Sequence, residues 1–231
     1  MIASLIASLL AMAQPLGSGP PPVAGPRLDV QAVVAKVQKR YDDAVDFKAR
    51  FTQTLTSATL KRTTNSSGLV TFKKPGRMRW DYEKPDKSSY ITDGGVLWLY
   101  EPEDKQAFKQ DLKSSQLPSA LAFLLGKGKL ASEFDITFGP DRGASGPGQP
   151  SEKNYVLSLS PKTPQAQVKS IVFVVDPRDW FVRQSEITDA QGNTNLIVFA
   201  DVQMNAHVPD ALFKFTPPAG TRVIDTGKLG K

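Results

Sequence analysis

Residues 77–100 read RMRWDYEKPDKSSYITDGGVLWLY, and this stretch decides the fold class. Within it, Met78, Trp80 and Tyr82 alternate with charged residues, which is the period of a strand that buries one face. The Asp-Gly-Gly at 93–95 is a hairpin signal, and strand-forming residues flank it on both sides. The stretch therefore predicts antiparallel strands joined by short turns.

The same alternation continues on both sides of this stretch, with turn residues between short apolar runs. A long antiparallel sheet of this kind tends to curl, so the pattern predicts a mainly β fold, a half-open antiparallel barrel with an apolar interior. Alternation alone leaves open whether that interior is filled or hollow, and which strand face looks inward. We expect ten or eleven strands in meander order, at 47–55, 68–72, 77–82, 90–92, 96–100, 106–111, 134–138, 155–160, 168–175, 180–188 and 194–202.

Two segments carry a helical pattern instead. Asp29 is a suitable N-cap, and apolar residues recur at helical spacing from Val30 to Asp42. The segment Leu117–Leu125 is rich in helix formers, accepts Pro118 in its first turn and is apolar almost all round. Such a short helix must be covered on most sides or must itself cover something, so we expect both helices to cover the curled sheet.

The first 26 residues contain no charged side chain and differ from the rest of the chain. Residues 1–13 are apolar and too short to span a bilayer. They end in Ala11-Met12-Ala13, which matches a signal-peptidase site, so they predict a signal peptide. The usual positive residue after Met1 is missing, and an ordinary N-terminal hydrophobic helix is the alternative. Residues 14–26 are rich in Pro and Gly and predict a linker, so the folded domain is expected at 27–231.

Composition excludes several classes of chemistry. The chain has no cysteine and one histidine, His207, in an expected surface loop, which leaves little for a metal site or a nucleophile–base pair. No phosphate-binding or hydrolase motif is present. We therefore expect neither an enzyme nor a cofactor. The net charge of +6 predicts attraction to acidic surfaces, either anionic lipid or nucleic acid.

Four blocks, in order, resemble the LolA family. They are Phe51-Thr52-Gln53, the run from Phe72 to Trp80 around Pro75, residues 85–100, and Phe213–Gly220. The resemblance implies an incomplete barrel with a helical lid over an apolar cavity. It also implies a monomeric periplasmic carrier that receives the acyl chains of lipoproteins from an inner-membrane ABC transporter. The cargo would pass to an outer-membrane lipoprotein receptor.

The resemblance also suggests which residues form the site. Before Pro75 the family usually carries an Arg that holds the lid, whereas this chain has Lys74, which keeps the charge but lacks the planar donor fork. We expect Lys74 to control the lid more loosely, or together with Arg77 or Arg79. The candidate lid residues are Leu121, Phe123, Leu124 and Leu125, and the candidate cavity wall is Phe72, Met78, Trp80, Leu97 and Leu99.

Each of these features also has a plainer interpretation. Apolar residues at strand spacing are more often solid core than ligand wall, and the 117–125 helix alone reads as a buried core helix. The basic residues from Lys73 to Arg79 could form a solvated face. Two other functions compete with the carrier: an envelope sensor of lipid or lipoprotein on the same fold, and a nucleic-acid binder. The expected export and the lack of a base-stacking motif argue against nucleic acid.

Overall fold

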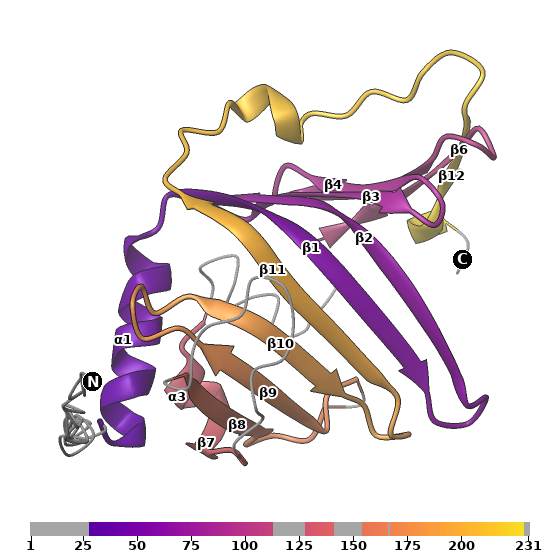
Figure 1. The fold of residues 1–231 in the computed structure, drawn as a ribbon. Helices are drawn as coiled ribbons and strands as arrows, with labels where there is room; N and C mark the ends of the chain where they lie inside the picture. Colours follow the sequence, from indigo (N-terminus) through magenta and orange to yellow (C-terminus); the bar gives the residue numbers. More distant parts are fainter. Residues whose placement is uncertain (1–27, 113–127, 141–153, 166, 229–231) are drawn as a thin grey trace, which may run out of the picture.

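The computed structural model describes residues 28–112, 128–140, 154–165 and 167–228, which contain one open sheet of twelve strands (Figure 1). The strand order along the sheet is β12-β6-β5-β4-β3-β2-β1-β11-β10-β9-β8-β7. The strands are β1 (Asp46–Ser57), β2 (Arg62–Lys73), β3 (Arg77–Lys84), β4 (Ser88–Thr92), β5 (Val96–Glu101), β6 (Gln106–Asp111), β7 (Phe134–Phe138), β8 (Tyr155–Pro161), β9 (Ser170–Val175), β10 (Val182–Thr188), β11 (Thr194–Met204) and β12 (Arg222–Asp225). The predicted mainly β fold built on an unclosed sheet is confirmed.

The sheet is strongly curled, as its side-chain contacts demonstrate. Strands β3 and β11 are separated by β2 and β1, so their axes would lie about 14 Å apart on a flat sheet. The ring centroids of Trp80 on β3 and Phe199 on β11 are only 6.3 Å apart. Their side chains therefore converge on a concave face, which we call the inner face.

The predicted N-terminal helix is present as α1 (Val30–Asp43). The carboxylate of Asp29 accepts a hydrogen bond from the backbone N–H of Ala32 at 2.8 Å, which confirms the N-cap. The helix buries Val33, Val34, Val37 and Tyr41 in the core. It lies beside the β7–β10 half of the sheet and contacts the short helix α3 (Leu130–Glu133). It does not extend over the β2–β6 half (Figure 1).

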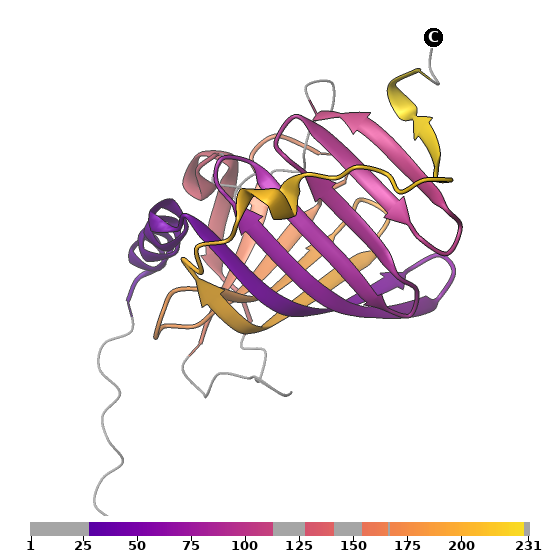
Figure 2. The same ribbon diagram turned by 90° about the horizontal axis from the view of Figure 1, so that it is seen from above.

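The chain after β11 crosses the outer, convex face of the sheet (Figure 2). It forms the 3-10 helix η2 (Asp210–Phe213), runs on in extended form, and ends in β12 and the short turn η3 (Thr226–Lys228). Strand β12 pairs with β6 in parallel, unlike all the other neighbouring pairs. The parallel pairing was not expected from the meander pattern, because a long crossover rather than a hairpin brings these two strands together.

Several sequence predictions fall outside the described residues. These are the signal peptide, the linker and the mid-chain helix with its four lid candidates, Leu121, Phe123, Leu124 and Leu125. Within the described parts of the chain, no helix is both long enough and apolar enough to cross a bilayer.

Candidate functional site

The five candidate wall residues lie on one face of the sheet. Phe72 pairs with Met78, which pairs with Thr92 and through it with Leu97. In the same way Trp80 pairs with Tyr90 and through it with Leu99. Residues directly opposite on neighbouring strands point to the same side, so the other four share the inner face with Trp80.

The part of the inner face near α1 is a packed aromatic cluster. Phe47 contacts both Phe72, at 4.8 Å between ring centroids, and Phe181, at 5.5 Å. Phe51 lies 4.8 Å from Trp80. These rings are almost fully buried, with Phe72 at 2% and Trp80 at 8% exposure. For Phe72, Met78 and Trp80, the plainer interpretation as core therefore describes their present environment.

The inner face is more accessible over β4, β5 and β6. Leu97 and Leu99 are half-buried, and so is Phe108, which pairs with Leu99 across β5 and β6. Tyr90, on the same face, is 36% exposed. Large apolar side chains that remain accessible on a concave surface are typical of a ligand-binding wall.

A hollow of about 410 Å³ opens where strands β1 and β10 end and β11 begins, away from α1. The inner-face residues Leu55, Ile187 and Asn195 line it, together with Thr56, Ser57, Gln167, Val168, Asp189, Asn193 and Thr194. Its size falls within the usual range for small-molecule pockets. We call it the mouth of the inner face.

Polar side chains join the inner face next to the mouth. The hydroxyl of Tyr82 donates a hydrogen bond to Gln53 Oε1 at 2.8 Å, and Gln53 Nε2 donates to Asn195 Oδ1 at 2.9 Å. Burial raises the pKa of Tyr82 to about 12, which keeps the phenol neutral and able to donate. We call these three residues the polar belt.

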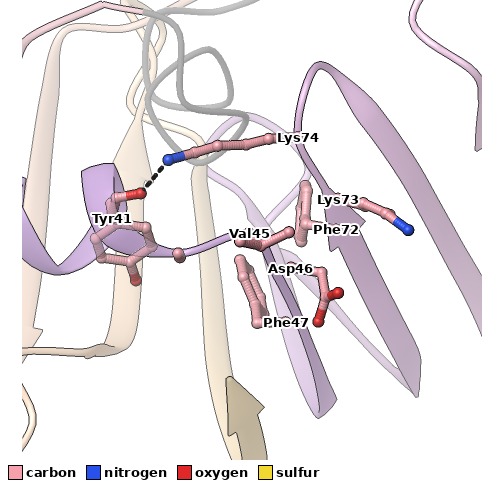
Figure 3. A pocket seen from close by; sticks show the side chains of 8 residues that line it. Tyr41, Val45, Asp46, Phe47, Phe72, Lys73 and Lys74 are labelled. Atoms are coloured by element: carbon pink, nitrogen blue, oxygen red, sulfur yellow. Dashed lines mark hydrogen bonds between the residues drawn. The ribbon is translucent and has the colours of Figure 1, made fainter. Parts of the chain in front are cut away.

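The candidate lid-control residue, Lys74, lies at the end of α1 (Figure 3). Its ammonium donates to the backbone carbonyls of Tyr41 and Asp42 at 2.5 and 2.8 Å, and so caps the last turn of the helix. The cavity beside it is only about 10 Å³, roughly one water molecule. The lid itself lies outside the described residues, so lid control by Lys74 stays a prediction.

The other basic residues of this block lie on the outer face and bind the chain's own C-terminal segment. Asp210 receives ion pairs from Lys73 and Arg77, each at 2.7 Å. These cations hold the pKa of the Asp210 carboxyl below its usual range. Arg79 pairs with Asp81 at 2.7 Å and donates to the carbonyl of Leu212 at 3.3 Å. The basic run is therefore used for internal contacts rather than forming a solvated face.

Sequence reasoning missed Phe108, Tyr90 and the polar belt as parts of the inner face. The first two follow the same alternation as Leu97 and Leu99, so pairing register was the missing information. Gln53 lies in the Phe51-Thr52-Gln53 block, but its partners come from β3 and β11. In the described parts of the chain, no group of three or more His, Cys, Asp or Glu residues could hold a metal ion.

Comparisons with known proteins agree with this architecture. The family model for the outer membrane lipoprotein carrier protein LolA matches residues 43–216. The chain is 33% identical to an outer-membrane lipoprotein carrier protein of Ralstonia nicotianae over 159 residues, 69% of each chain. It is 31% identical to the protein of that name in Cupriavidus pinatubonensis over 180 residues, 77% of this chain and 80% of the relative.

Among solved structures, an uncharacterized conserved protein from Thermus thermophilus has the same fold. The TM-score is 0.53 at 10% sequence identity, and the match covers 84% of this chain and 98% of the other. The family match spans most of the described sheet, including the aromatic cluster, the half-buried wall and the polar belt. This chain belongs to the LolA family.

Proposed function

We propose that this chain is a periplasmic carrier that binds the acyl chains of lipoproteins on its inner face. The observation that carries the proposal is the half-buried apolar wall of Leu97, Leu99 and Phe108, continuous with the aromatic cluster at Trp80. The names of the relatives, outer-membrane lipoprotein carrier proteins, support lipoprotein as the cargo. An inner-membrane ABC transporter would supply the cargo, and an outer-membrane receptor would accept it.

The free energy of burying hydrocarbon explains why such cargo needs a carrier. Each methylene removed from water contributes roughly 0.8 kcal/mol, so an acyl chain of about fifteen methylenes represents on the order of 12 kcal/mol. Escape into water is then negligible, and transfer must occur directly between apolar surfaces. The described strands form a sheet that does not close, which suits loading and release better than a sealed barrel.

The proposal is tested by binding of a synthetic triacylated lipopeptide, measured by native mass spectrometry and by competition against a fluorescent fatty-acyl probe. Leu99→Asp places a carboxylate on the wall and should weaken binding at least about tenfold, because a bound acyl chain would strip water from that charge. Leu69→Asp is the matched control. Leu69 is 42% exposed on the outer face of β2, so its substitution should leave affinity unchanged.

Two results would contradict the proposal. One is a folded wild-type protein that binds no acylated peptide. The other is equal weakening by Leu99→Asp and Leu69→Asp, which would mean that the inner face is not the binding surface.

A further inference from the structure

The inner face changes in polarity along β1. Phe47, Ala49 and Phe51 occupy three successive inward positions from the α1 end, and all are buried and apolar. The next inward position is Gln53, a primary amide only 7% exposed. The partner of Gln53 on β2, Ser66, is also polar. The wall therefore runs from aromatic near α1 to polar at the mouth.

Gln53 is held on both sides by the polar belt. Its Oε1 accepts from Tyr82 and its Nε2 donates to Asn195. A primary amide has two N–H donors, so one donor of Gln53 remains after these bonds. Among the described residues, the Asn195 amide acts as an acceptor through Oδ1, and neither of its N–H groups is engaged. The belt thus offers surplus donors, and Asn195 lines the mouth.

Surplus N–H donors beside an apolar wall suit a neutral carbonyl at the end of a hydrocarbon chain. A free fatty-acid anion fits less well, because Asp189 lines the same mouth. Hydrogen bonds from Asn193 and from nearby backbone N–H groups lower the pKa of the Asp189 carboxyl, so it stays ionised and repels a second carboxylate. Ester and amide carbonyls carry no charge and only accept hydrogen bonds, so they match the donors present.

We propose that Gln53 and Asn195, positioned by Tyr82, bind the ester or amide carbonyls of acylated cargo and so orient each chain with its methyl end away from the mouth, on the wall of Leu97, Leu99 and Phe108. This inference rests on the proposed carrier function and adds a direction to it. Trp80 provides an internal reporter, because it lies at the level of Ala49, four residues from Gln53 or about 13 Å along β1.

The orientation is tested by fluorescence quenching in the variant W98F/W180F, in which Trp80 is the one remaining tryptophan. Two lipopeptides are compared, brominated either near the methyl end of the acyl chains or near the carbonyls. Chains whose methyl ends lie away from the mouth should quench Trp80 severalfold more strongly when the bromine is near the methyl end, because Trp80 shares the register of Leu99. Stronger quenching by the carbonyl-proximal bromine would overturn the inference, and this test leaves the belt itself unmodified.

The role of the belt is tested by comparing an ester-linked lipopeptide with its ether-linked analogue, which lacks the carbonyls. The wild-type protein should prefer the ester by about fivefold, as expected for one net hydrogen bond. Gln53→Leu combined with Asn195→Leu removes both donors and should abolish that preference, whereas general damage to the wall would weaken both ligands alike. Asn65→Leu is the matched control, an amide replaced on the exposed outer side of the same hairpin, where it bonds only Thr54 among the described residues.

The outcomes separate this inference from the function on which it rests. Binding of both lipopeptides with equal affinity by the wild-type protein would contradict the role proposed for the polar belt and would leave the proposed carrier function unaffected. Binding of neither would overturn both.

Discussion

Lys74 Nζ lies 2.5 Å from the backbone carbonyl oxygen of Tyr41, so the residue that follows β2 caps the end of α1. A second bond to the carbonyl of Asp42 completes the cap. Replacing Lys74 with Met should lower the free energy of unfolding by about 1 kcal/mol, because the last helical carbonyls lose a cationic donor. Urea unfolding followed by circular dichroism measures this change.

Lys39→Met is a suitable control, because Lys39 sits on the same helix in an exposed pair with Asp43. This substitution should leave the unfolding midpoint unchanged. If the two variants were equally stable, the contact between Lys74 and α1 would not stabilise the helix end.

Asp176 should make the protein sensitive to acid. Its carboxylate is inaccessible to solvent and binds Arg178, in the turn between β9 and β10, and Arg183, on β10. The hydrogen bond from Arg178 is the main cause that lowers the pKa of Asp176 from 3.8 to about 2. Because the folded pKa lies below the unfolded one, this stabilisation is present above about pH 4 and is lost as the pH falls toward 2.

Asp176→Asn should therefore cost about 2 kcal/mol at neutral pH, the scale of a hydrogen bond to a charged group. The difference in stability between wild type and variant should shrink between pH 4 and pH 2. Chemical denaturation across that range checks this, and a gap independent of pH would contradict the assignment.

Phe215 should fasten the C-terminal segment to the outer face. Its ring lies 5.5 Å from that of Trp98 and 5.1 Å from that of Tyr100. In a variant whose one tryptophan is Trp98, Phe215→Ala should shift the emission to the red and should lower stability by about 1 kcal/mol. Leu212→Ala, at an exposed position of the same segment, should leave the emission unchanged.

Tyr82 should ionise at a higher pH than an exposed tyrosine. Burial raises its pKa to about 12 from 10, so the neutral phenol contributes stability that is present below pH 10 and lost as the pH rises from 10 toward 12. Over that interval the stability of the wild-type protein should fall more steeply than that of Tyr82→Phe. Phenolate absorbance measures the ionisation of Tyr82, and thermal unfolding measures the stability of both proteins. Parallel stability curves would show that Tyr82 is accessible to base.

Local patterns in the sequence were enough to predict most of the strands and α1. The alternation of Met78, Trp80 and Tyr82, the turn at 93–95 and the cap at Asp29 each depend on near neighbours. Strand β2 is longer than predicted, because residues 62–67 are polar on both faces and show no alternation. Full pairing with β1 keeps that segment extended.

The remaining features depend on contacts between distant parts of the chain. Alternation is symmetric, so only the curl of the sheet, seen in the approach of Trp80 to Phe199, distinguishes the inner face from the outer. The pairing of β12 with β6 and the meeting of Gln53 with Asn195 join residues more than one hundred positions apart. No periodicity within one segment encodes such contacts.

The path of the C-terminal segment has a consequence for how this scaffold can diversify. Three contacts hold this segment on the outer face. Asp210 pairs with Lys73 and Arg77 on either side of the β2–β3 turn, Phe215 packs on β5, and β12 pairs with β6. The β2–β6 half of the sheet is thus stabilised by residues on the outer face, away from the proposed ligand-binding face. The residues that would bind cargo are therefore separate from those that stabilise the sheet. Substituting inward side chains such as Leu97, Leu99 and Phe108 offers a route to new hydrophobic cargoes without a change of fold.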